Sequence, residues 1–148
     1  MMQLFKTVTP IPGRTYAIHP YSDKEHASGN GADVAVTVEG SNVCIRLWEG
    51  TTFQKWECVE KNGWLGFICR ASTASPTGAY LGFNVYEVLV CTAQNQDKWE
   101  DFSVVLHDDG CAWQMRKDDH LAYVGMVNAN ELKMLRDRTT KWGFTEWV

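Results

Sequence analysis

The chain has 148 residues, of which 45% are hydrophobic and 22% charged, and a formal net charge of −4. A chain of this length usually forms one domain that buries enough surface to fold without staples. The acidic balance argues against a nucleic-acid partner, because phosphate recognition needs clustered lysine and arginine. The sequence also lacks the long apolar run of a membrane span, so we expect no membrane partner.

Cysteine usage predicts reduced thiols. The five cysteines are odd in number and show no Cys-x-x-Cys spacing, so at least one must be unpaired. The first residues, 1–6, lack the apolar stretch of a signal peptide. We therefore expect a cytoplasmic protein whose cysteines are small core residues, with unconventional export left open as an alternative.

Short apolar segments alternate with turn signals along the whole chain. In 34–38 the valines fall on one face at a period of two, which is typical of a strand. The segment 131–136 could form a helical turn, but its place in the pattern favours a strand. The predicted strands are 14–19, 33–38, 43–48, 55–60, 64–69, 79–84, 87–91, 99–106, 111–115, 121–126, 131–135 and 142–147.

The dipeptide Lys-Trp recurs every 43 residues and ends at Trp56, Trp99 and Trp142. Such fixed-period similarity indicates a repeat architecture, here three repeats of four strands over 13–62, 63–109 and 110–148. This pattern predicts one all-β domain over 1–148: a β-trefoil of twelve strands, with a six-stranded barrel capped by three hairpins. The apolar residues eight positions before each tryptophan are Trp48, Cys91 and Met134.

Three segments carry a resemblance to known trefoil families. The run 45–48, Ile-Arg-Leu-Trp, followed by 54–56, Gln-Lys-Trp, resembles the Ile-Gln-Leu-Trp and Gln-x-Trp elements of ricin-B-type lectins. The run 78–82 resembles the Gly-x-Tyr-Leu element of fascin-like trefoils, and 56–67 resembles small trefoil proteins of filamentous fungi. The resemblance covers the whole chain as a fold and implies a non-catalytic binding protein.

A sugar site needs an aromatic face for stacking and polar groups for the hydroxyls. In the lectin resemblance, Trp48 is the stacking residue and Arg46 and Gln54 are polar contacts. Asp33 precedes Trp48 by the separation expected for the hydroxyl-binding carboxylate. If instead Val34 aligns with the corresponding leucines of the other repeats, Asp33 only shapes a turn.

Other interpretations remain open for these residues. Trp48 could pack in the core, because Cys91 and Met134 hold its place in the other repeats, and Gln54 could bond the backbone. We expect repeats two and three to be inactive, and the three Lys-Trp tryptophans to fill the barrel. Trp64, Trp113 and Trp147 lie outside that spacing and are candidate contacts if they are exposed.

No histidine pairs with cysteine or carboxylate at metal-ligand spacing, so we expect no metal, no cofactor and no enzymatic activity. The predicted function is non-catalytic carbohydrate binding, with at most one site, in repeat one. The alternative is a protein-interaction trefoil, either fascin-like and cytoskeletal or resembling a protease inhibitor. The predicted partner is thus a glycan or a protein, and the chain a monomer or weak homodimer.

Overall fold

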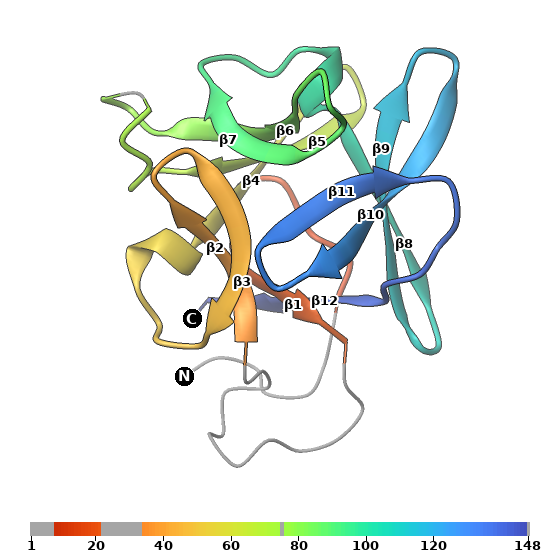
Figure 1. The fold of residues 1–148 in the computed structure, drawn as a ribbon, viewed down its shortest axis with the longest axis horizontal. Helices are drawn as coiled ribbons and strands as arrows, with labels where there is room; N and C mark the ends of the chain where they lie inside the picture. The colour runs from red at the N-terminus through yellow and green to blue at the C-terminus, as the bar shows by residue number, and fades with distance from the viewer. Residues whose placement is uncertain (1–7, 22–33, 75, 148) are drawn as a thin grey trace.

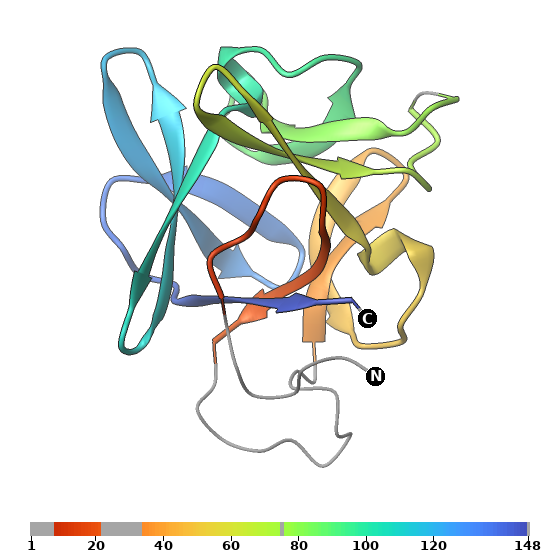
Figure 2. The same cartoon turned by 180° about the vertical axis from the view of Figure 1, so that it is seen from behind.

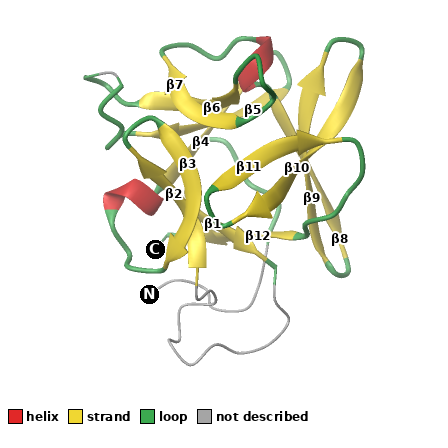
Figure 3. Ribbon diagram, viewed as in Figure 1, coloured by secondary structure: helices red, strands yellow, loops and turns green. Residues whose placement is uncertain are grey.

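The computed structural model describes residues 8–21, 34–74 and 76–147, which form twelve strands and two single-turn 3-10 helices (Figure 1, Figure 3). Each observed strand overlaps a predicted one, including 131–135, where a helical turn was the alternative. The elements are β1(Thr15–Pro20), β2(Val34–Glu39), β3(Asn42–Leu47), η1(Thr52–Gln54), β4(Trp56–Lys61), β5(Trp64–Cys69), β6(Ala79–Phe83), β7(Leu89–Ala93), η2(Lys98–Glu100), β8(Phe102–His107), β9(Gly110–Lys117), β10(His120–Asn128), β11(Glu131–Leu135) and β12(Trp142–Glu146).

Six of these strands close into a barrel. Antiparallel pairing runs from β1 to β4, β5, β8, β9 and β12, and β12 pairs back with β1. The pair that closes the barrel, β1 with β12, has the longest separation in sequence, and Ile18 lies opposite Phe144. Local turn chemistry supports the hairpins: Asn62 and Gly63 join β4 to β5 with φ angles of 55° and 85°, as a tight hairpin turn requires. Figure 2 shows the barrel from behind.

The other six strands form three hairpins, β2–β3, β6–β7 and β10–β11, which cover one end of the barrel (Figure 1). Each hairpin is tied to the next by a backbone hydrogen bond from the middle of its second strand to the turn of a neighbour. The predicted β-trefoil is therefore confirmed. The three bonds run from Ile45 N to Ala129 O at 2.7 Å, from Cys91 N to Ser41 O at 2.9 Å and from Met134 N to Glu87 O at 2.8 Å.

Aromatic side chains fill the barrel. Trp113 is fully buried, and its ring lies 5.3–5.7 Å from the rings of Phe67, Phe102, Trp142 and Phe144. Large aromatic side chains contribute much of a core's burial energy, and edge-to-face contacts add to it. Trp113 is therefore not exposed and is not one of the candidate contacts.

The fixed 43-residue period is wrong in repeat two. Trp56 and Trp142 are each the first residue of a barrel strand and fully buried, and each donates its indole N–H to a carbonyl of its own hairpin. In repeat two that place belongs to Phe102, which is also fully buried. Trp99 instead lies in η2 and is 41% exposed, so the prediction that it fills the barrel is wrong. The true spacings are 46 and 40 residues, because the loops before these strands differ in length.

The hairpin hydrogen bonds also correct the alignment of Trp48. The residue equivalent to Cys91 and Met134 is Ile45, and these three form one buried layer. Trp48 follows that layer by three residues and stands outside the core cluster. The facing layer consists of Val36, Leu81 and Val124, which pair with Ile45, Cys91 and Met134. The alternative that aligned Val34 with the leucines of the other repeats, Leu81 and Leu121, is therefore wrong.

Candidate functional site

Trp48 lies at the surface of segment 47–54, which runs from the last residue of β3 to the end of η1 and which we call the β3–η1 loop. Its indole is half-buried and packs against that of Trp147, with ring centroids 5.4 Å apart and planes tilted by 48°. The ammonium of Lys55 lies 5.4 Å from the centroid of the Trp147 ring. The core position considered for Trp48 is excluded, and part of its surface is available for contact.

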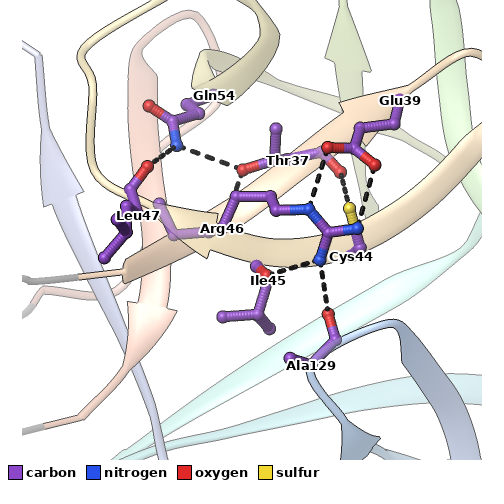
Figure 4. Close-up of polar contacts among 9 residues, drawn as sticks. Thr37, Glu39, Cys44, Ile45, Arg46, Leu47, Gln54 and Ala129 are labelled. Atoms are coloured by element: carbon purple, nitrogen blue, oxygen red, sulfur yellow. Dashed lines mark hydrogen bonds and ion pairs between the residues drawn. The ribbon is translucent and has the colours of Figure 1, made fainter.

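The buried side chain of Gln54 holds the backbone of this loop by hydrogen bonds. The side chain is 1% exposed, and its Oε1 accepts hydrogen bonds from Glu49 N at 2.9 Å and Gly50 N at 3.0 Å. Its Nε2 donates to Leu47 O at 2.8 Å and to Thr37 Oγ1 at 3.1 Å (Figure 4). All four hydrogen-bonding positions of the amide are filled. The direct ligand contact predicted for Gln54 does not fit this geometry, and Gln54 instead holds the loop that carries Trp48.

Arg46 is held by the protein itself. Its Nε and Nη2 donate to the two carboxylate oxygens of Glu39 at 2.8 and 2.9 Å, and Nη1 donates to Ile45 O and Ala129 O at 3.0 and 3.3 Å. These hydrogen bonds from Arg46 lower the pKa of Glu39. In Figure 4 the Arg46 guanidinium and the Gln54 amide extend in different directions. Arg46 therefore joins two hairpins of the cap.

The four predicted residues are only partly brought together. Gln54 bonds the backbone on both sides of Trp48, whereas Arg46 bonds Glu39 and the turn of another hairpin. Asp33 lies outside the described residues. Trp64 is half-buried, and the Arg116 guanidinium carbon lies 5.4 Å from the centroid of its ring.

Repeat two carries a pocket that the sequence interpretation missed. It lies between β6, β7 and η2 and has a volume of about 230 Å³. Trp99 stacks on Phe83 at its edge, with centroids 5.4 Å apart and planes 24° apart, and Glu100 lines it. The signal was present in the sequence: a second aromatic residue, Phe102, follows Trp99 and can fill the barrel in its place.

Glu100 is the acidic side chain that lines this pocket. Its Oε1 accepts a hydrogen bond from Asp97 N at 3.0 Å, within the single turn of η2. The pKa of Glu100 is raised to about 7, mainly by burial and to a smaller extent by the nearby Asp97 and Asp101 carboxylates, while the hydrogen bond from Asp97 N opposes the rise. The carboxyl is thus a neutral hydroxyl donor at acidic pH and a charged acceptor above neutrality.

Within the described residues, the cysteines and histidines provide no second chemical centre. None of the five cysteines forms a disulfide and all are buried, and burial raises the pKa of Cys58 and of Cys91 to about 12. Such thiols carry little thiolate, which is the reactive form. His19 is buried against Thr145 Oγ1 at 2.8 Å. Among the residues in 8–21, 34–74 and 76–147, no three His, Cys, Asp or Glu side chains gather as metal ligands.

In the part of the chain that the structure describes, no helix has the length and apolar character needed to cross a membrane.

The fold is shared with solved β-trefoil structures. A ricin B-like lectin of Macrolepiota procera, in complex with lactose, superposes with a TM-score of 0.66 at 11% identity, over 93% of this chain and 98% of that one. The designed threefold-symmetric protein ThreeFoil gives 0.65 at 15% identity, over 90% and 99%. The β-trefoil lectin of the Vibrio vulnificus hemolysin/cytolysin, with N-acetyl-D-lactosamine bound, gives 0.63 at 12% identity, over 91% and 96%.

No known protein-family model matches the chain. No curated protein matches it in sequence. The superpositions show that the chain has the β-trefoil fold of ricin-B-like lectins. At these sequence identities the likeness extends to the fold alone.

Proposed function

We propose that this protein is a non-catalytic carbohydrate-binding β-trefoil with a site on the β3–η1 loop of repeat one. The observation that carries the proposal is the partly exposed indole of Trp48 on a loop whose backbone is fixed by Gln54. The lectin-like fold supports it, since two of the superposing structures are lectins with a bound sugar.

The chemistry of this site is stacking together with hydroxyl hydrogen bonds, without metal or cofactor. Trp48 offers an apolar face to a sugar ring. Asp33 remains the proposed polar contact, Gln54 positions the loop, and Arg46 joins two hairpins of the cap rather than contacting the sugar. A loop already held in place loses little conformational entropy on binding, which favours affinity. One such site binds a monosaccharide weakly. Avidity for a multivalent glycan would require a second sugar site on the same molecule or in the same oligomer.

A protein partner is the second candidate, and one observation favours it. The same loop exposes Leu47 by 72% and Phe53 by 42%, beside the half-buried Trp48. Aromatic side chains at the centre of an interface often dominate the binding energy. A partner that docks on this surface would bury all three side chains.

The test is a glycan array with the wild-type protein, Trp48→Ala and the matched control Trp64→Ala, which removes another half-buried tryptophan, on β5. We expect glycan binding that is lost in Trp48→Ala and kept in Trp64→Ala. Binding that survives Trp48→Ala would contradict the location of the site. No binding by the wild-type protein would contradict carbohydrate binding, and co-sedimentation with filamentous actin would then test the protein-partner alternative.

A further inference from the structure

Repeat two is open where repeat one is filled. Gln54 ends η1 two residues before Trp56, and Glu100 ends η2 two residues before Phe102, so the two side chains occupy the same place. In repeat one the amide of Gln54 donates a hydrogen bond to the hydroxyl of Thr37, which follows Val36 on β2. The equivalent position on β6, after Leu81, is Gly82, which has no hydroxyl to offer. The carboxyl of Glu100 also lacks the amide N–H through which Gln54 bonds to β2 and β3 in repeat one.

The carboxyl of Glu100 is placed directly over this glycine. A Cβ built at Gly82 would lie 2.7 Å from Glu100 Oε2 and 2.8 Å from Trp99 O, so any side chain there would displace both. Glu100 is 9% exposed, and within the described part of the chain no basic side chain pairs with it. A buried carboxyl without a cationic partner is costly for a fold. Its position in a pocket therefore favours a functional role.

An aromatic platform stands at the rim of the same pocket. Trp99 is 41% exposed, and Phe83 supports it in a stacked arrangement with centroids 5.4 Å apart. Phe102 has taken over the barrel position, so Trp99 has no part in closing the core. The pocket thus joins a supported indole to a buried oxygen acceptor, the two groups that a sugar ring needs.

We propose that this pocket is a second carbohydrate site that takes one neutral pyranose ring, stacked on Trp99 with its hydroxyls bonded to Glu100. The inference rests on the proposed function for the ligand class but uses residues of a different repeat. The volume of about 230 Å³ suits one ring, because it is below the range of about 300–1,000 Å³ typical of drug-sized ligands. Above neutral pH the carboxylate of Glu100 lines the pocket, which disfavours acidic sugars.

The experiment is an NMR titration of the ¹⁵N-labelled full chain with the methyl β-glycosides of galactose, glucose and N-acetylglucosamine. The seven indole N–H signals are assigned by single Trp→Phe variants. We expect saturable shifts of the Trp99 indole and the Gly82 amide with at least one glycoside. In Trp99→Ala the Gly82 shift should disappear, whereas Phe53→Ala, which removes an equally exposed aromatic from η1, should leave it unchanged.

Two further arms test the role of the carboxyl. Glu100→Gln replaces an acceptor by a donor, and we expect about fivefold weaker binding above neutral pH, the effect of losing one net hydrogen bond. Methyl glucuronide should bind more weakly than methyl glucoside. Equal affinities for the two glycosides, or an unchanged affinity in Glu100→Gln, would overturn the assignment of Glu100.

The two sites report separately. Shifts at Trp48 without shifts at Trp99 and Gly82 would overturn the second site and leave the first intact. Shifts at Trp99 and Gly82 alone would support the second site and count against the first. A Gly82 shift that persists in Trp99→Ala would overturn the stacking role, and no shift at either site with any glycoside would overturn both proposals.

Discussion

Replacing Glu100 by glutamine should make the protein more stable at high pH and leave it unchanged at low pH. The pKa of this carboxyl is about 7, against a usual 4.5, so the folded protein holds its proton more tightly than the unfolded chain does. The stabilising contribution of the proton is therefore full below pH 4.5 and is lost as pH rises to 7. A shift of this size corresponds to about 3 kcal/mol at most, at about 1.4 kcal/mol for each pH unit.

Glutamine is nearly isosteric, carries no charge and can keep the bond from Asp97 N. We expect Glu100→Gln to match the wild-type free energy of unfolding at pH 4.5 and to exceed it by about 2–3 kcal/mol at pH 8. Urea unfolding followed by tryptophan fluorescence at pH 4.5, 6 and 8 measures this difference. Glu60→Gln, at an exposed position on β4, serves as the control. A difference that does not change with pH, or that is larger at pH 4.5, would refute the reasoning.

Three further predictions follow from packing. Gln54→Ala should lower the free energy of unfolding by about 2–4 kcal/mol in urea denaturation, because it leaves backbone groups of the β3–η1 loop unsatisfied; a loss below 1 kcal/mol would contradict this role. Phe102→Ala should cost about 3–5 kcal/mol and Trp99→Ala much less, and thermal melts showing the reverse order would restore Trp99 to the core. Gly110→Ala should lower the melting temperature, because Gly110 has φ of +106° and a Cβ there would meet the Tyr21 ring at 2.7 Å.

The fold could be predicted because its signals are local and repeated. Turn residues such as Asn62 and Gly63 mark the hairpin ends, and alternating valines mark β2. The strand at 131–135 was assigned from its place in the repeat, which is set by tertiary pairing rather than by helix propensity. These signals need no knowledge of side-chain contacts.

The repeat alignment failed where the loops differ in length. Lys-Trp recurs at Trp99 by sequence alone, but the residue that enters the barrel is decided by the strand start, which is Phe102. The same error placed Trp48 in a layer that belongs to Ile45. A one-dimensional period cannot distinguish these choices, because insertions in one loop and deletions in another keep the mean spacing near 43 residues.

The candidate site could be predicted only in part. A half-buried aromatic at Trp48 agrees with the lectin resemblance, but the sequence could not show that the loop backbone and Thr37 would occupy every hydrogen-bonding position of the Gln54 amide. The role of Arg46 was equally ambiguous from the sequence, because its ion-pair partner Glu39 lies on the neighbouring strand of the hairpin. The pocket at Gly82 and Glu100 exists because Gly82 has no side chain where repeat one has Thr37, and a sequence motif does not record such an absence.

The pairing of β1 with β12 has a consequence for synthesis. Tyr16 and Glu146 are partners in the register that closes the barrel, although they lie 130 residues apart. The barrel therefore cannot close before β12 has been synthesised, because β12 is the strand that pairs with β1. Contacts of such long range form slowly and leave strand edges unpaired in the meantime. The nascent protein must carry an open sheet edge until translation reaches β12, and during that interval it is most exposed to aggregation.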